Sequence, residues 1–515
     1  MSNDDGRPDF SDIVDEQAMA DAMANLQGCG AEGVAIPMGH PGGHPGKMPA
    51  GHPAVPAGHP PVHMIPAGHP PFVGEKPAGH PEVGDMPEGH RPVTGHPGGH
   101  PAGIPLSGDR QRHGGARSVG FRPGGGPQAV AYEERTGMKA PRIIAWEITR
   151  SCNLNCVHCR AASRYGTYEG ELTLEQIKSV IDNIVTITNP IIILTGGEPL
   201  LREDIWDIVD YCHEKGAMPV IGTNATLITP ELAQKMAQHG IPRISVSIDA
   251  PTAQEHDDFR VMPGAFDDSI EGIKNAKAAG VGVQINTTVT KYNADKLEEI
   301  HALADGLGVD AFHIFMLVPT GRASDLAEQE LSPEKYEEVL TWAYHRQKTS
   351  DLHFKPTDAP HYYRIIRQLA AAEGREVTVE EYGLDAMTRG CLGGITFCFI
   401  SHIGDVQPCG YFDRQLGNVK EQAFSDIWTD STVFRDLRDY SKLKGKCGVC
   451  EYKGVCGGCR ARALEATGGD YLAAEPYCSY IPPMWEGDPY DLTRDLFGEL
   501  MAKKAGAADS DAEKA

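Results

Sequence analysis

The stretch Cys152-Asn-Leu-Asn-Cys156-Val-His-Cys159 spaces three thiols as C-x3-C-x2-C, directly after the apolar segment 143–149. Three thiolates at this spacing can hold three corners of a 4Fe–4S cube, whereas the long first gap does not fit a regular C-x2-C knuckle. One iron then lacks a protein ligand, as substrate chemistry requires. The alternative is a fragment of a structural zinc site. That alternative lacks a fourth ligand nearby, because His158 is too close in sequence to complete a tetrahedron.

A second motif, Thr195-Gly-Gly-Glu-Pro199, follows another apolar segment, 190–194. Glycines let the backbone approach a ligand closely, and a carboxylate pairs with an ammonium group. Together the two motifs resemble those of the radical S-adenosylmethionine (SAM) superfamily. The resemblance implies that the open iron chelates SAM and that the 5′-deoxyadenosyl radical is the reactive group, with no catalytic side chain assigned. It also implies that the SAM ammonium group is bound by Gly196, Gly197, Glu198 and Pro199.

Apolar segments alternate with amphipathic helical patterns between residues 141 and 345. Six βα units in this order imply an α/β fold with a parallel sheet and right-handed crossovers. A partial barrel and a doubly wound sheet fit this pattern equally, and the superfamily resemblance selects a partial (β/α)6 barrel. In both folds the sites lie at the carboxyl ends of the strands. The predicted strands are 142–148, 190–195, 217–222, 242–248, 281–289 and 310–318, and the clearest helical patterns are 174–188, 230–239 and 265–279.

Polar residues also follow the third and fourth predicted strands. Asn224 closes the third, and Ser247 and Asp249 close the fourth. The resemblance implies that these residues line SAM and that Arg260 binds its methionine carboxylate. Alternatively, Asn224 caps the next helix and Asp249 belongs to a turn.

A second group of cysteines lies between residues 391 and 478. It suffices for two four-thiolate sites, and zinc would fit such sites as well as iron. The order of the cysteines resembles the SPASM extension of radical SAM enzymes, which holds one or two auxiliary 4Fe–4S clusters. The resemblance implies a first cluster on Cys391, Cys398, Cys409 and Cys459 and a second on Cys447, Cys450, Cys456 and Cys478. The gap between Cys456 and Cys459 is shorter than usual, which leaves the allocation of Cys459 open.

Composition divides the chain further. Residues 1–140 are dense in Gly, Pro and His, with a repeated Gly-His-Pro, and cannot bury enough apolar surface to offset the entropy of ordering. We predict a disordered tail there, which is either a solvated segment or a transition-metal-binding tract. The other predicted parts are the partial barrel 141–345, a helical linker 346–385, a SPASM-like module 386–485 and a C-terminal tail 486–515.

Charge and cysteine use exclude several classes of protein. The net charge of −24 argues against a nucleic-acid surface. No apolar run approaches a membrane span and no secretion leader opens the sequence, so the 13 cysteines indicate metal ligation in a reducing cytoplasm rather than disulfides. We therefore expect a cytoplasmic protein without a membrane partner. Cys29 and Cys212 fall outside the cluster motifs and are predicted to be ordinary thiols.

Four stretches resemble the heme b synthase family of the siroheme-dependent heme pathway. They are 144–152, 313–322, 359–364 and 388–394. The resemblance implies oxidative decarboxylation of two propionates of iron-coproporphyrin III to vinyl groups, with an electron donor such as flavodoxin or ferredoxin and an unidentified acceptor. A pocket that binds propionates needs cationic side chains, because these pair with carboxylates. The candidates are Arg322, His361, Arg364, Arg367 and Arg389, with Tyr362 and Tyr363 against the macrocycle.

Other functions remain open at this point. The didecarboxysiroheme deacetylases and the heme d1 enzymes share the same architecture and cofactors. A SPASM maturase of ribosomal peptides is a third possibility, although the Gly/Pro/His-rich N-terminus differs from the peptide-recognition fold of such enzymes. An iron–sulfur or metal-storage protein would explain the thiols and the tail. It would leave the Gly-Gly-Glu-Pro motif and the open three-cysteine cube unexplained.

Overall fold

The computed structural model describes residues 123–378, 382, 386 and 388–487. The Gly-His-Pro repeats, Cys29 and the tail after residue 487 lie outside the described residues. The first described element is helix α2 (Pro127–Thr136), whose buried Ala129 and Tyr132 pack into the main core. The folded part therefore begins before the predicted domain boundary at residue 141.

The six predicted strands are present and form one parallel sheet. They are β1 (Ile143–Thr149), β2 (Ile191–Gly196), β3 (Met218–Thr223), β4 (Arg243–Ser247), β5 (Gly282–Val289) and β6 (Ala311–Met316). The order of strands in the sheet is β7-β6-β5-β4-β3-β2-β1-β8-β9. Strands β1 to β7 are thus neighbours in chain order, without the reversal that defines a doubly wound sheet. The partial-barrel prediction is confirmed.

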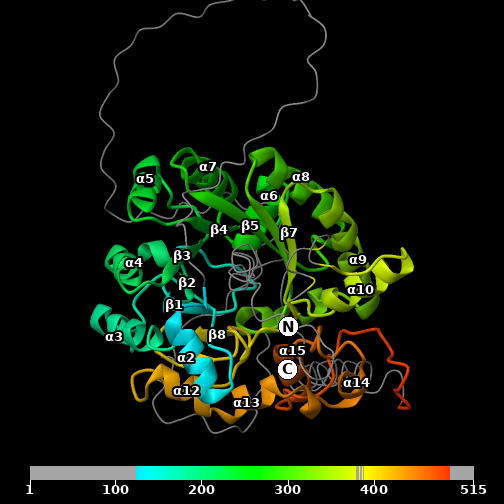
Figure 1. The fold of residues 1–515 in the computed structure, drawn as a ribbon. Coiled ribbons are helices and arrows are strands. Elements are labelled where there is room, and N and C mark those ends of the chain that lie inside the picture. Colours follow the sequence, from blue (N-terminus) through cyan, green and yellow to red (C-terminus); the bar gives the residue numbers. More distant parts are fainter. Residues whose placement is uncertain (1–122, 379–381, 383–385, 387, 488–515) are drawn as a thin grey trace, which may run out of the picture. The chain divides into compact units, whose positions relative to one another are not determined.

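Helices connect the strands and lie outside them (Figure 1). Those between β1 and β6 are α3 (Leu174–Ile184), α4 (Ile205–Glu214), α5 (Pro230–Gln238), α6 (Ala253–Arg260), α7 (Ala265–Ala278) and α8 (Leu297–Leu307), with the short 3-10 helices η1 (Pro199–Leu201) and η2 (Ala294–Lys296). Alternate residues of β1 face opposite sides. Ile144 and Trp146 join the core under the helices, whereas Ile143 and Ala145 join a smaller cluster on the inner face of the sheet.

The sheet is wider than the sequence predicted. Within the segment expected to be a helical linker, strand β7 (His353–Thr357) pairs in parallel with β6. Within the cysteine-rich segment, β8 (Phe397–Ile400) pairs in parallel with β1, and β9 (Val406–Gln407) pairs antiparallel with β8. The cysteine-rich module is therefore joined to the barrel through the same sheet.

The remaining elements surround these added strands. They are η3 (Gly321–Gln329), α9 (Pro333–Thr349), α10 (Tyr362–Ala372), α12 (Phe424–Asp430), α13 (Thr432–Arg438), η5 (Tyr440–Lys442), α14 (Gly445–Val449) and α15 (Arg460–Thr467). Among the described residues, no helix has the length and apolarity that a membrane span needs.

Candidate iron–sulfur and SAM site

The C-x3-C-x2-C loop leaves the carboxyl end of β1 and brings its three thiols together. Cys152 and Cys156 are buried, and Cys159 packs against them. Burial raises the pKa of the Cys152 thiol, and the negative charges of Cys156, Glu198 and Cys159 raise it further. The three sulfurs therefore lie within electrostatic reach of one another, as the corners of one cluster require.

The loop that follows β6 fixes the shape of this cysteine loop. Arg322 donates from Nε to the Cys156 carbonyl at 2.7 Å and from Nη1 to the Ser163 carbonyl at 2.8 Å. Gly321 has φ of 60°, and a Cβ there would lie 2.0 Å from the carbonyl oxygen of Arg160. Arg322, predicted to bind a propionate, thus uses Nε and Nη1 to hold the cysteine loop, and its buried Nη2 has no hydrogen-bond partner among the described residues.

The Gly-Gly-Glu-Pro turn at the end of β2 packs on the start of the same loop. The backbone N–H of Gly197 donates to the Thr149 carbonyl at 2.9 Å, and that of Glu198 donates to the Ser151 carbonyl at 2.7 Å. A Cβ on Gly196 would lie 2.0 Å from the Thr149 oxygen, and one on Gly197 would lie 2.2 Å from the Ser151 oxygen. Both glycines are therefore required by close contact with the chain's own backbone.

The carboxylate of Glu198 joins the ends of β2 and β3. It accepts hydrogen bonds from the Thr223 hydroxyl at 2.9 Å and from the backbone N–H groups of Asn224 at 2.8 Å and Leu200 at 3.1 Å. Burial raises the pKa of Glu198 to about 7, and these donors oppose the rise. Asn224 in turn donates from Nδ2 to Asn153 of the cysteine loop at 2.8 Å. Two of the residues predicted to bind SAM therefore converge beside the cluster loop.

A buried ion pair lies next to Cys156 of the cysteine loop. Arg260 pairs with Asp249 through Nη2 and approaches the Cys156 sulfur through Nη1 at 3.7 Å. Burial raises the pKa of Asp249 to about 6, an effect that Arg260 opposes. Ser247 is buried at the end of β4. The residues predicted to bind SAM thus lie at the carboxyl ends of β2, β3 and β4 or beside the cysteines.

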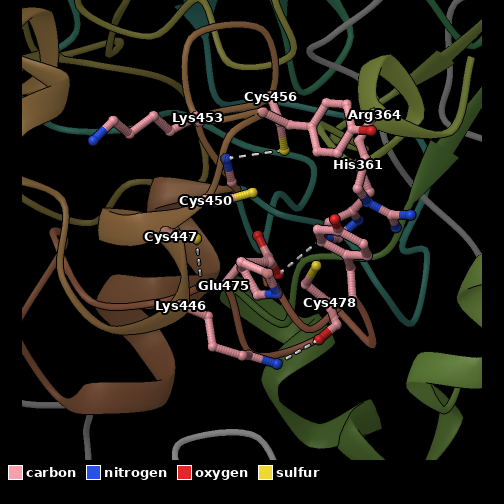
Figure 2. Close-up of a pocket in the computed structure, with 14 residues that line it drawn as sticks. His361, Arg364, Lys446, Cys447, Cys450, Lys453, Cys456, Glu475 and Cys478 are labelled. Carbon is pink, nitrogen blue, oxygen red and sulfur yellow. Dashed lines mark hydrogen bonds and ion pairs between the residues drawn. The ribbon is translucent and has the colours of Figure 1, made fainter. Parts of the chain in front are cut away.

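The second predicted set of auxiliary cysteines meets in one cavity. Figure 2 shows these four thiols around it, together with the side chains of Lys446, Lys453 and Arg364. Burial raises the pKa of the Cys456 thiol well above its usual range, with further contributions from Cys478 and Cys447. Nearby cations suit a site that would hold several thiolates. The four cysteines are Cys447, Cys450, Cys456 and Cys478.

The first predicted auxiliary set is only partly brought together. Cys409 and Cys459 pack in one cluster of side chains. Cys398 instead lies on the opposite face of β8 from Phe397 and Phe399, in the core under the helices. Cys398 therefore lies apart from Cys409, because successive side chains of a strand point to opposite faces.

The described residues do not form a binding site for a single metal ion. Over residues 123–378 and 388–487, no three His, Cys, Asp or Glu side chains are close enough to hold one metal ion. A cube makes a different demand, because each of its thiolates binds a different iron.

The other candidates for propionate binding have protein partners. Arg364 forms a two-pronged ion pair with Glu337, at 2.8 Å and 2.5 Å. Arg367 donates to the carbonyls of Tyr363 at 2.8 Å and Ala386 at 3.0 Å. Arg389 lies over the ring of Tyr440, 3.6 Å from its centroid.

The remaining candidates are buried. His361 lines the cavity of the second auxiliary set, and Tyr362 and Tyr363 belong to the main core. Cys212, predicted to be an ordinary thiol, is buried in α4, and burial raises its pKa to about 12.

Comparison with known proteins agrees with this arrangement. Residues 146–304 match the radical SAM superfamily, and residues 391–459 match the SPASM iron–sulfur cluster-binding domain. The AdoMet (SAM)-dependent heme synthase of Nitratidesulfovibrio vulgaris is 51% identical over 360 residues, which span 69% of this chain and 98% of that protein. The Fe-coproporphyrin III synthase of Methanosarcina barkeri is 32% identical over 65% of this chain and 87% of that protein.

The fold has a solved counterpart. Streptococcus suis SuiB bound to S-adenosylmethionine is similar over 68% of this chain and 81% of that protein, with 19% identity and a TM-score of 0.55. This likeness concerns the fold. From the motif matches and the near full-length similarity to the heme synthase, the chain belongs to the radical SAM superfamily, in the family of the AdoMet-dependent heme synthases.

Proposed function

We propose that this enzyme decarboxylates two propionates of iron-coproporphyrin III to vinyl groups and so makes protoheme. The observation that carries the proposal is 51% identity to an AdoMet-dependent heme synthase over 98% of that protein's length. The relatives named Fe-coproporphyrin III synthase and pre-heme d1 synthase are more distant, at 32% and 30% identity. When bound, the reduced catalytic cluster and SAM supply a carbon radical that can take a hydrogen atom from a propionate.

In this proposal the chain's own residues place the catalytic cluster and SAM. Cys152, Cys156 and Cys159 would hold the catalytic cluster and leave it open to SAM. Arg322 keeps the carbonyls of the loop in place, and the Gly-Gly-Glu-Pro turn anchors its start. Glu198, Asn224, Ser247, Asp249 and Arg260 form the polar surroundings at the strand ends.

The electron balance of this reaction indicates a role for the cysteine-rich module. Removal of one hydrogen atom from the propionate β-carbon and loss of carbon dioxide leave an alkene and one surplus electron. The cavity lined by four thiols suits an auxiliary cluster that passes this electron to an acceptor. The catalytic cluster needs a separate one-electron donor, for which flavodoxin or ferredoxin is our candidate. We place the reaction in the cytoplasm, where thiolates stay reduced.

The test offers two tetrapyrroles to the anaerobically reconstituted protein. With SAM and a reductant, iron-coproporphyrin III should lose two carbon dioxide molecules and give protoheme, as measured by mass spectrometry. Didecarboxysiroheme should remain unchanged. Conversion of didecarboxysiroheme alone would refute the proposal in favour of a deacetylase. Cleavage of SAM with neither tetrapyrrole changed would favour another substrate, such as a peptide.

A further inference from the structure

Strand β8 decides which cysteines can share the first auxiliary site. Its register with β1 pairs Cys398 with Ile144, and both side chains belong to the core under the helices. Phe397 and Phe399 face the other way, and Cys409 packs with them on the inner face. Burial raises the pKa of Cys398, opposed only by Arg438, and no other thiol contributes. Cys398 is therefore a core residue on the opposite face of β8 from Cys409.

The other three cysteines do lie near one another. Cys409 and Cys459 pack in the same side-chain cluster. The Cys409 thiol lies within electrostatic reach of Cys459, Asp358 and Cys391. The backbone N–H of Cys391 donates to the carbonyl of Cys456, three residues before Cys459, at 3.3 Å. Cys391 and Asp358 also lie within electrostatic reach of Cys459. Three thiols and one carboxylate thus form a group within electrostatic reach.

Backbone contacts place Asp358 beside two of these cysteines. Asp358 follows the carboxyl end of β7. Its carbonyl accepts hydrogen bonds from Arg462, three residues after Cys459, and from the Tyr336 hydroxyl at 3.3 Å. On the other side, a Cβ added to Gly390 would lie 2.5 Å from Cα of Pro360. The backbone just before Cys391 therefore touches the turn that begins with Asp358.

One oxygen of the Asp358 carboxylate has no hydrogen-bond partner among the described residues. This oxygen, Oδ2, is buried. The residue also has φ of 52°, a left-handed conformation that glycine adopts freely and Asp adopts only occasionally. A buried carboxylate oxygen without a donor is unfavourable unless it binds a proton or a cation, and non-glycine residues in a left-handed conformation gather at functional sites.

Glu475, the other carboxylate near Cys459, is already occupied. Its oxygens accept from the backbone N–H of Cys459, from Nε of Arg462 at 3.1 Å and from the backbone N–H of Tyr477 at 3.3 Å. His361 lines the cavity of the other cysteine set. Asp358 is thus the acidic residue next to the three thiols whose carboxylate is not fully used in hydrogen bonds with described residues, and it can supply the fourth ligand.

We propose that the first auxiliary cluster is held by Cys391, Cys409, Cys459 and the carboxylate of Asp358, with Cys398 taking no part. Three thiolates and one carboxylate would give this iron–sulfur cluster one weaker, more easily displaced ligand than the four-thiolate site beside it. The inference concerns the module and does not depend on which tetrapyrrole the enzyme uses.

The test compares full-length variants after anaerobic reconstitution, with iron per chain and the EPR spectrum of the reduced protein as readouts. Cys409→Ala identifies the signal of this cluster by its loss. Cys398→Ala should leave iron content and every signal as in the unaltered protein. Asp358→Cys should keep the iron but change the same signal that Cys409→Ala removes. Asp358→Ala should make that signal sensitive to added thiolate or cyanide, because one iron is then open.

Three outcomes would overturn the proposal. The first is a changed signal in Cys398→Ala together with an unchanged one in Asp358→Cys. The second is an Asp358→Ala protein whose signal stays insensitive to added ligands. The third is a Cys409→Ala protein with unaltered iron and spectrum, because then no cluster occupies the site. Circular dichroism checks folding, and Asp358→Asn, which keeps the shape, should show the same altered signal if Asp358→Ala does not fold.

Discussion

Replacing Arg322 with Ala should loosen the catalytic cluster without touching any of its ligands. The change removes two hydrogen bonds from a guanidinium to the carbonyls of Cys156 and Ser163, at 2.7 Å and 2.8 Å. Hydrogen bonds to charged groups contribute about 1.5–3 kcal/mol each. Because Arg322 is only partly buried, the low end applies, giving about 3 kcal/mol for the pair. That corresponds to a shift on the order of 100-fold toward loop conformations that cannot hold the cluster.

Arg367→Ala is the matched control for this change. Arg367 also donates two hydrogen bonds to backbone carbonyls, at 2.8 Å and 3.0 Å, but these belong to Tyr363 and Ala386, outside the cysteine loop. Both variants are reconstituted, and the rate at which a chelator removes iron from the catalytic cluster is followed by EPR. We expect much faster loss in Arg322→Ala and an unchanged rate in Arg367→Ala. Equal rates in the two variants, or a raised KM for the tetrapyrrole with a stable cluster, would refute the argument and restore Arg322 as a substrate ligand.

The other predictions concern both kinds of cluster and the tail. Replacing all three cysteines of the C-x3-C-x2-C motif with Ala should abolish 5′-deoxyadenosine formation while auxiliary EPR signals persist. Gly197→Ala should weaken SAM binding by equilibrium dialysis, because its Cβ would lie 2.2 Å from the Ser151 oxygen. Deleting residues 1–122, which spares α2, should keep turnover and reduce nickel or zinc binding. Replacing Cys447 and Cys450 with Ala should leave 5′-deoxyadenosine formation but give little protoheme. A parallel fall of both products in a folded protein would point to a structural role.

The sequence predicted the barrel strands well because buried parallel strands are continuous apolar runs. The observed β1, for example, is Ile143–Thr149 against a predicted 142–148. Strand β7 was missed because His353-Phe-Lys-Pro-Thr357 is short and contains a lysine and a proline. A proline is tolerated at the edge of a sheet, where one side of the strand needs no partner. β7 occupies such an edge, since it pairs with β6 and ends the strand order.

The site was predictable to the extent that its residues are adjacent in sequence. The C-x3-C-x2-C loop and the Gly-Gly-Glu-Pro turn each lie within one short stretch, so their spacing carries the signal. The clamp from Arg322 to the Cys156 carbonyl joins residues far apart in the chain and left no trace in either stretch. The position of Cys398, by contrast, is visible in the sequence. In Phe397-Cys398-Phe399 the alternation of side chains along a strand places the thiol on the opposite face from both rings. The order of the cysteines alone does not contain this information.

Contacts between the barrel and the cysteine-rich module fix the position of the catalytic cysteine loop relative to the auxiliary loop at Cys409. Arg160, the residue after the last catalytic cysteine, binds Glu147 of β1 at 2.8 Å and donates to the carbonyl of Gly410 at 3.4 Å. Its guanidinium also lies over the ring of Phe399 in β8, 4.6 Å from the centroid. Gly410 directly follows Cys409, so one buried side chain touches the catalytic strand, the added strand and the auxiliary loop. Because β1 and β8 are also paired, movement of one loop relative to the other would have to break the sheet. In the proposed electron relay, these contacts would keep the two cluster sites at a fixed separation, whichever acceptor takes the electron.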